Sequence, residues 1–238
     1  MKRIVESPLL FLIANICLCL CSFTWAVAQD SKPTKGLASA VPSTKDSKLE
    51  TAIFGGGCFW CTEAVYQRVN GVKSIVSGYA GGTVPHPSYK AVTTGATGHA
   101  EVVQVTFDPD IVSFEELLLV FFKTHDPTSL NQQGADIGTQ YRSVVFYADE
   151  AQRLATEKIR DKLVDEKIYR KIVTEISPQP EFYPAEAYHQ NYFNTHPQES
   201  YCRSVIVPKI AKFEKLFEDI SRKNAEKRAR KEKKESKK

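Results

Sequence analysis

The 238-residue chain has a hydrophobic content of 42% and a formal net charge of +4, a composition typical of a globular protein with one sizeable domain plus tails. The positive charge is concentrated at the C-terminal end, because residues 222–238 carry ten Lys or Arg against three Glu and leave residues 29–221 net acidic. These numbers exclude a domain that is itself strongly basic. The tail is either a solvated charged run or a segment that contacts anionic surfaces.

The N-terminal segment has the pattern of a secretory signal peptide. A charged start precedes an uncharged, mostly apolar run from Pro8 to Val27, and Ala26-Val27-Ala28 is a small-residue cleavage pattern. We therefore expect residues 1–28 to be removed before Gln29 and the protein to be exported, to a periplasmic or secreted location if the source is bacterial. An uncleaved membrane anchor is the alternative, because the run is just long enough to span a bilayer.

Three further segments follow the signal peptide. Residues 29–49 are rich in Ser, Lys, Thr and Pro and predict a disordered linker. Residues 50–215 form the predicted domain, and 216–238 hold the end of a helix and the basic tail. Within the domain, strand-like runs are found at Thr51–Phe54, Val72–Gly78, Ala100–Phe107, Tyr141–Tyr147 and Ile172–Ile176.

Helix-like segments alternate with these strands and predict a single-domain α/β or α+β sandwich. A capping box at Ser113–Glu116 opens a helix over Phe114–Thr124, and Asp149 opens another that runs to about Val164. Pro208 is expected to start a last helix. The irregular stretch Tyr79–Gly98 is long for a loop inside a compact domain, which predicts a functional role for it.

The run Gly55-Gly56-Gly57-Cys58-Phe59-Trp60-Cys61 is the most informative feature of the chain. Cys58 opens a predicted helix over Phe59–Val69, where unpaired N–H groups and the helix dipole favour a thiolate. The glycines permit a sharp turn and a close approach of substrate. The two aromatic residues after the cysteine supply one wall of an apolar pocket, so the pattern predicts a nucleophilic cysteine.

Removal of the signal peptide leaves three cysteines, Cys58, Cys61 and Cys202. An odd number is a poor disulfide framework in an exported protein and indicates at least one reactive thiol. The histidines have no convincing metal-ligand spacing, and we expect no metal. Cys202 lies in a polar segment, 188–204, that we expect to be flexible enough to bring it to a catalytic thiol. A disulfide to Cys61 or an ordinary buried position is the alternative.

Glu101 alternates onto the same face as the apolar residues of the run Ala100–Phe107. A desolvated carboxyl has a raised pKa and can serve as a general acid. Because Glu101 is near the start of the run, a strand-end position in water is an equal alternative.

Tyrosine and aspartate side chains complete the set of candidates. Tyr79, Tyr89 and Tyr141 come from separate segments and could donate hydrogen bonds to an oxyanion. For any single one of them, however, the residue pattern alone favours an ordinary half-buried core or edge position. Asp136 lies in a glycine-punctuated turn and is equally an Asp that bonds to its own backbone.

Five segments occur together in the order of one known family, and the chain resembles the A-type peptide methionine sulfoxide reductases over about residues 50–215. The segments are Gly57-Cys58-Phe59-Trp60, Gly78-Tyr79-Ala80-Gly81-Gly82, Pro87-Ser88-Tyr89, Gly98-His99-Ala100-Glu101-Val102 and Gly138-Thr139-Gln140-Tyr141-Arg142-Ser143. The resemblance implies a two-layer α/β sandwich around a mixed sheet. It also implies reduction of methionine (S)-sulfoxide, free or in oxidised proteins, and hence repair of oxidised methionine.

The resemblance further implies roles for individual residues. Cys58 would attack the sulfoxide sulfur, and Glu101 would protonate the oxygen, which would also accept hydrogen bonds from Tyr89 and Tyr141. Phe59 and Trp60 would hold the substrate's methyl group, with Asp136 in a supporting position near the substrate.

Recycling of the enzyme is implied in the same way. Cys202 would attack the Cys58 sulfenic acid and form a disulfide, which an external thioredoxin-type dithiol would reduce. No bound cofactor is expected, and we expect a monomer.

Cys61 departs from the family pattern, which often has Gly at this position. It could resolve the sulfenic acid in place of Cys202, although neighbouring cysteines in a formed helix must distort it to bond, which favours Cys202. The Cys58-x-x-Cys61 spacing also leaves a thioredoxin-like disulfide oxidoreductase as an alternative enzyme. A cysteine peptidase lacks a distinguished histidine base, and an exported binding module is the non-enzymatic alternative.

Overall fold

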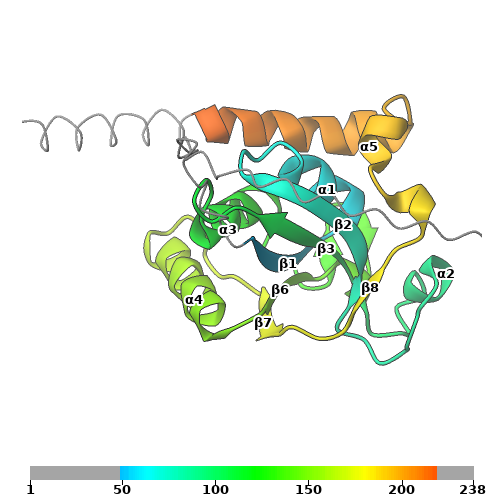
Figure 1. The fold of residues 1–238 in the computed structure, drawn as a ribbon, viewed down its shortest axis with the longest axis horizontal. Helices are drawn as coiled ribbons and strands as arrows, with labels where there is room; N and C mark the ends of the chain where they lie inside the picture. Colours follow the sequence, from blue (N-terminus) through cyan, green and yellow to red (C-terminus); the bar gives the residue numbers. More distant parts are fainter. Residues whose placement is uncertain (1–48, 219–238) are drawn as a thin grey trace, which may run out of the picture. The chain divides into compact units, whose positions relative to one another are not determined.

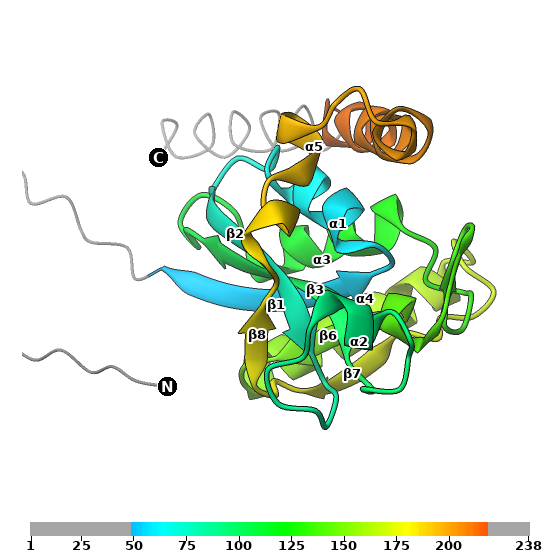
Figure 2. The ribbon, with the colours of Figure 1, turned by 90° about the vertical axis from the view of Figure 1, so that its right-hand side faces the viewer.

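The computed structural model describes residues 49–218 of the chain (Figures 1 and 2). The predicted signal peptide, nearly all of the predicted linker and the basic tail from residue 219 onward lie outside the described residues. Within residues 49–218, no helix combines the length and the apolar character needed to cross a membrane.

A six-stranded mixed sheet forms the centre of the described residues. Its strand order is β7-β6-β1-β3-β2-β8, and all neighbours pair antiparallel except β6 and β7, which are parallel. The strands are β1 (Glu50–Gly56), β2 (Val72–Ala80), β3 (Ala100–Phe107), β6 (Ser143–Tyr147), β7 (Glu175–Pro178) and β8 (Phe182–Pro184), and a separate small hairpin joins β4 (Gln132–Gln133) to β5 (Asp136–Ile137).

The main helices pack on one face of this sheet (Figure 2). The α-helices are α1 (Phe59–Tyr66), α2 (Tyr89–Val92), α3 (Phe114–Thr124), α4 (Glu150–Asp165) and α5 (Tyr192–Thr195). Shorter turns are η1 (Thr139–Tyr141), η2 (Ala187–His189) and the wide π turn η3 (Cys202–Ile206). The turn η3 belongs to a C-terminal helix that the structure describes from Ser200 to Glu218. The predicted two-layer sandwich around a mixed sheet is confirmed.

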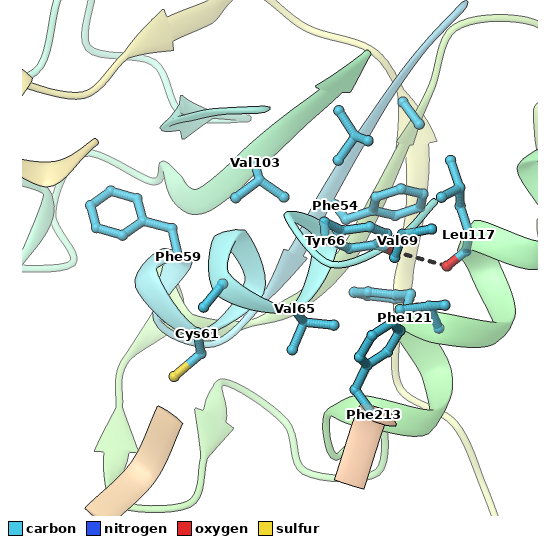
Figure 3. Packing of buried hydrophobic residues seen from close by; sticks show 14 of the residues in the cluster. Phe54, Phe59, Cys61, Val65, Tyr66, Val69, Val103, Leu117, Phe121 and Phe213 are labelled. Carbon is cyan, nitrogen blue, oxygen red and sulfur yellow. Dashed lines mark hydrogen bonds between the residues drawn. The ribbon is translucent and has the colours of Figure 1, made fainter. Parts of the chain in front are cut away.

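The core holds α1 firmly against the sheet and α3. The ring of Phe54 on β1 stacks on Tyr66 of α1 at 5.2 Å and on Phe121 of α3 at 5.3 Å. The Tyr66 hydroxyl donates to the carbonyl oxygen of Leu117 at 2.9 Å, as Figure 3 shows. Burial of such large side chains contributes about 2 kcal/mol or more each, so α1 is fixed in place by its aromatic end.

Several predicted elements agree with the structure. The strand Ala100–Phe107 and the helix Phe114–Thr124 have the expected bounds. The capping box is present, with the Ser113 hydroxyl accepting from the Glu116 N–H and the Glu116 carboxylate accepting from the Ser113 N–H. Asp149 caps α4 as expected.

Two predicted strand bounds are wrong for local reasons. The run predicted from Ile172 enters the sheet only at Glu175, because the Val173 N–H donates to the Pro127 carbonyl and not to a strand. Tyr141 precedes its strand and closes a tight turn by donating from its N–H to the Gly138 carbonyl at 3.0 Å. The predicted functional loop contains α2 and begins only after β2 ends at Ala80.

The prediction that Pro208 starts the last helix is also wrong. The helix begins at Ser200 and runs through the wide turn η3 before it reaches Pro208. Proline lacks the N–H that an interior helical residue donates, and wide turns are a common accompaniment of such an irregularity.

Replacement of Ser113 by Ala removes the cap of α3 and is expected to lower the free energy of unfolding by about 1 kcal/mol. Urea denaturation of the two proteins measures the difference. Ser113→Thr is the matched control, because threonine keeps the capping hydroxyl. An equal loss in both variants, or no loss in the alanine variant, would contradict this role of the cap.

Candidate active site

Cys58 lies between β1 and α1, in the N-cap position of the helix, with φ −54° and ψ 125°. The preceding Gly57 has φ +91°, a conformation that side chains rarely adopt. A Cβ atom on Gly57 would also lie 2.5 Å from Cγ of Gln133. Glycine is therefore required at this turn, which presents a cysteine with only 7% of its surface exposed.

Glu101 meets the same turn from the neighbouring strand. Its Oε2 accepts a hydrogen bond from the Phe59 N–H at 3.1 Å, and the residue is 1% exposed. Burial raises the pKa of the carboxyl to about 8, with smaller contributions from Asp136 and Cys61, while the hydrogen bond from Phe59 lowers it. Of the two alternatives that the sequence left open, the structure shows the buried one.

The surroundings of Cys58 favour the protonated thiol. Burial raises its pKa well above the usual value, and contact with Cys61 and the charge of Glu101 act in the same direction. Burial therefore opposes the thiolate that the N-terminus of an eight-residue helix favours.

Two half-buried tyrosines adjoin the Cys58 and Glu101 pair. Burial is the main cause that raises the pKa of Tyr89 to about 12, and it also raises the pKa of Tyr141. A negative charge on Glu101 or on Cys58 acts in the same direction on both hydroxyls. The two phenols therefore stay protonated and able to donate. The structure brings together four of the predicted residues from four segments of the chain.

Tyr79 has a structural role that separates it from Tyr89. It is fully buried, and its hydroxyl donates to Oε2 of Glu186 at 2.9 Å. The other oxygen of Glu186 accepts from the Tyr89 N–H at 2.9 Å. Glu186 thus fixes the start of α2, and nothing in its sequence context distinguishes it.

Asp136 reaches the site through another tyrosine. The Tyr201 hydroxyl donates to Oδ2 of Asp136 at 2.8 Å and lies 3.6 Å from the sulfur of Cys61. Burial raises the pKa of Tyr201, and the neighbouring thiols raise it further. Asp136 therefore orients a hydroxyl beside the thiols and is not merely an Asp bonded to its own turn.

An aromatic cluster covers one side of the turn. The Trp60 ring stacks on Tyr192 at 3.7 Å, and its N–H donates to Nδ1 of His189 at 3.2 Å. The Phe59 ring lies 5.0 Å from the His189 ring. Phe59 and Trp60 thus belong to an aromatic cluster with His189 and Tyr192, two residues that the sequence did not identify.

Glu63 of α1 holds this aromatic cluster in position. It is 2% exposed, and its carboxylate accepts from the Asn191 N–H at 2.8 Å and from the Tyr192 N–H at 3.3 Å. These bonds hold α5, and with it the Tyr192 ring, against α1. Glu63 was not among the residues predicted from the sequence, and the available signal was a glutamate on the otherwise apolar face of a predicted helix.

Of the alternatives that the sequence left open for Cys202, the structure shows the buried position. Cys202 is fully buried in η3 among residues of the main core, because apolar residues of the C-terminal helix pack on α1 and α3. Cys58, Cys61 and Cys202 carry no disulfide. Within residues 49–218, no three His, Cys, Asp or Glu side chains are grouped so that they could hold a metal ion.

Comparison with known proteins places this geometry in one family. The family described as "Peptide methionine sulfoxide reductase" matches residues 50–221. The chain is 57% identical over 174 residues to the peptide methionine sulfoxide reductase MsrA of Polynucleobacter asymbioticus, which covers 72% of this chain and 91% of that protein. It is 56% identical to the MsrA of Saccharolobus solfataricus, over 72% of this chain and 96% of that protein.

Solved structures give the same result for the fold. Reduced Mxr1 from Saccharomyces cerevisiae superposes with a TM-score of 0.62 at 38% identity, over 66% of this chain and 91% of that one. Methionine sulfoxide reductase A of Corynebacterium diphtheriae gives a TM-score of 0.58 at 37% identity, over 63% and 76%.

Glu101→Gln is expected to flatten the dependence of stability on pH. The folded-state pKa of Glu101 is raised to about 8, so its contribution to stability is fully present below the unfolded pKa, near 4.5, and is lost as pH rises to about 8. A tenfold change in proton affinity between the folded and unfolded states corresponds to about 1.4 kcal/mol. Relative to the glutamine variant, the native protein should lose several kcal/mol between these limits, measured by urea denaturation.

The control is Glu214→Gln, which removes an exposed carboxylate from the C-terminal helix. Its pH dependence should follow the native protein. Parallel pH profiles for the native and Glu101→Gln proteins would contradict the buried, protonated state of Glu101.

Proposed function

This chain belongs to the family of peptide methionine sulfoxide reductases and reduces methionine sulfoxide by thiol chemistry, and we propose that the Cys58 site is where it does so. The observation that carries the proposal is the contact between Glu101 and the N–H of Phe59, which brings a buried carboxylic acid beside the buried thiol of Cys58. The substrate is methionine (S)-sulfoxide, free or in an oxidised protein, and the product is methionine.

The first step needs a nucleophile and an acid. Glu101 donates its proton to the sulfoxide oxygen, and the Cys58 sulfur bonds to the sulfoxide sulfur. As this intermediate collapses, the hydroxyl oxygen moves from the methionine sulfur to the Cys58 sulfur. The bonds from the methionine sulfur to the oxygen and to Cys58 both break, an S–O bond to Cys58 forms, and methionine leaves while Cys58 becomes a sulfenic acid. The thiol proton of Cys58 returns to Glu101. A pKa of about 8 supports this role, because the carboxyl is protonated at neutral pH.

The tyrosines assist by hydrogen bonding. Tyr89 and Tyr141 keep their protons and donate to the sulfoxide oxygen as charge builds on it. Their half-buried positions support the role, since a hydrogen bond is stronger where water is scarce.

Selection of the S epimer depends on the aromatic wall. Phe59 and Trp60 hold the methyl group of the substrate, while the oxygen faces Glu101. The opposite epimer would exchange these two groups and leave the sulfoxide oxygen against apolar rings, without its hydrogen bonds. Asp136 supports this arrangement through Tyr201.

Recycling requires a second thiol and an external donor. Cys202 attacks the Cys58 sulfenic acid and forms a Cys58–Cys202 disulfide with loss of water, and a thioredoxin-type dithiol reduces this disulfide by exchange. No tightly bound cofactor takes part. The cysteines available in the predicted mature chain support this scheme, because all three lie in or next to one site.

We further propose that the protein is exported and monomeric. The basic tail would contact anionic surfaces. The N-terminal sequence pattern supports export, and the ten basic residues of 222–238 support an electrostatic role of the tail. An exported enzyme needs a reductant outside the cytosol, where thiols tend to be oxidised.

Cys58→Ser is expected to abolish methionine formation while the protein stays folded, because serine is not nucleophilic enough to replace the thiol. The assay is single-turnover reduction of N-acetyl methionine sulfoxide by pre-reduced protein, with the S and R epimers supplied separately. The native protein should convert the S epimer alone. Methionine from the serine variant, or none from the folded native protein, would contradict the proposal and favour a binding module.

Expression of the full chain in a bacterial host is expected to yield a mature protein that begins at Gln29. Intact-mass spectrometry of the periplasmic fraction measures this start. Ala28→Leu is the control, because a large residue at the cleavage position should block removal of residues 1–28. A membrane-bound product of full mass from the unaltered sequence would show that the segment is an anchor.

A further inference from the structure

We propose that Glu186 is a positioning residue that sets the place of the Tyr89 hydroxyl relative to the carboxyl of Glu101. This inference rests on the proposed function, in which Tyr89 donates a hydrogen bond to the sulfoxide oxygen and Glu101 protonates that oxygen. Glu186 has no contact with the reacting atoms in this scheme, and it acts through the tyrosine.

A chain of contacts leads from Glu101 to Glu186. Glu101 on β3 lies opposite Tyr79 on β2, and residues that face each other across two antiparallel strands project to the same side of the sheet. The Tyr79 side chain is fully buried, and its hydroxyl donates to Oε2 of Glu186 at 2.9 Å. The carboxylate of Glu186 is therefore fixed with respect to the strands that carry the acid.

The backbone around Glu186 is attached to the edge of the sheet. Strand β8, which pairs with β2, ends two residues before Glu186. The Ala185 N–H donates to the Ser77 carbonyl at 2.9 Å. The side-chain amide of Gln190 accepts from the Ser77 N–H and donates to the Ala185 carbonyl, both at 2.9 Å. Both the backbone and the side chain of Glu186 are thus anchored to β2.

The N-terminal end of α2 is bound to this anchored carboxylate. The preceding residues 83–86 are all exposed, and α2 itself has only four residues. The Tyr89 N–H is one of the amide groups that the start of a helix leaves without an intrahelical partner. It donates to Oε1 of Glu186 at 2.9 Å, so the backbone of Tyr89 is held at a fixed place beside the sheet.

The opposite end of α2 is held independently of Glu186. The side-chain amide of Gln140 donates to the Thr93 carbonyl at 3.3 Å. Gln140 directly precedes Tyr141, so this bond joins α2 to the turn that carries the second tyrosine. Removal of the Glu186 carboxylate would therefore release the Tyr89 end of α2 and leave its other end in place.

Glu186 suits this role as an anion. Burial acts to raise its pKa, but hydrogen bonds from the Tyr89 N–H, from its own N–H and from the Tyr79 hydroxyl hold the pKa below its usual value. An ionised carboxylate accepts at both oxygens, which matches these two neighbouring donors. Nε2 of His189 is 3.8 Å from Oε2 of Glu186, too far for a hydrogen bond, so the aromatic cluster does not depend on Glu186 in the same way.

Single-turnover kinetics of Glu186→Ala test the proposal. Pre-reduced protein in excess is mixed with N-acetyl methionine (S)-sulfoxide, and the rate constant of methionine formation is measured as a function of protein concentration. We expect this rate constant to fall about tenfold or more, because a displacement of about 1 Å in a positioned group can cost about a hundredfold. The half-saturating concentration should stay near the native value, because the weakened hydrogen bond acts in the transition state.

A double-mutant cycle with Tyr89→Phe separates positioning from a general loss of structure. If Glu186 acts through the Tyr89 hydroxyl, Glu186→Ala should slow the reaction little further once that hydroxyl is absent. Losses that multiply in the double variant would overturn the proposal. It would also be overturned if Glu186→Ala were slow while Tyr89→Phe kept the native rate.

Two further variants control for charge and for folding. Glu186→Gln keeps an oxygen that accepts from the Tyr89 N–H, and the Tyr79 hydroxyl can accept from the new amide group, so most of the native rate should return. Glu181→Ala is the matched control, because Glu181 also accepts from a tyrosine hydroxyl, that of Tyr183 at 2.7 Å, but in an exposed position before β8. It should keep the native rate. Glu186→Leu, which fills the volume without an acceptor, repeats the test if the alanine variant fails to fold.

The outcomes separate this inference from the proposed function. A native rate in Glu186→Ala, or equal losses in Glu186→Ala and Glu186→Gln, would overturn the positioning role while the reductase activity stands. Absence of methionine from the folded native protein and from every folded variant would instead overturn the proposed function.

Discussion

The hydrogen bond from the Phe59 N–H to Glu101 is the constraint on which the site depends. It joins the first residue of α1 to β3, a strand in the middle of the sheet, and it fixes a carboxyl next to a cysteine that the Gly57 turn presents. The aromatic core around Phe54 and Tyr66 holds the helix in this position. Because both reacting groups are thereby withdrawn from water, burial becomes the largest influence on their pKa values.

Burial acts on the acid and the nucleophile in a way that suits the reaction. A carboxyl and a thiol both lose stability as anions in a solvent-poor site, so both begin as neutral groups. The carboxyl can then donate its proton, and the thiol can pass one back when attack begins. The pKa of Cys61, one helical turn away, is lowered to about 7, and the neighbouring Cys58 is the largest cause. Environments that separate the pKa values of neighbouring groups in this manner commonly mark distinct chemical roles.

Much of this arrangement could be predicted from sequence because local patterns encode it. The glycine-rich turn, the capping box of α3 and the period-two strand that carries Glu101 are short-range signals. The resemblance to a known family then indicated which reaction these residues carry out. Periodicity alone had left this question open. The roles assigned to individual residues remain predictions.

Other features depend on contacts between distant segments, which no local pattern reveals. Glu63 binds backbone N–H groups about 130 residues away, at Asn191 and Tyr192. The carboxylate of Glu186 likewise accepts hydrogen bonds from two tyrosines, from the Tyr79 hydroxyl in β2 and from the Tyr89 N–H in α2. The wide turn around Cys202 and the passage of the helix through Pro208 were missed because proline is usually a sign that a helix begins or ends.

The central claim is that Glu101 remains protonated at neutral pH because it is buried beside Cys58. Infrared difference spectroscopy tests it directly, by recording the carbonyl band of protonated carboxyl groups as a function of pH in the native protein minus Glu101→Gln. We predict one carboxyl band that disappears with a midpoint near pH 8, the value to which burial raises the pKa of Glu101. A band that is already lost by about pH 5, close to the ordinary glutamate pKa, would contradict it.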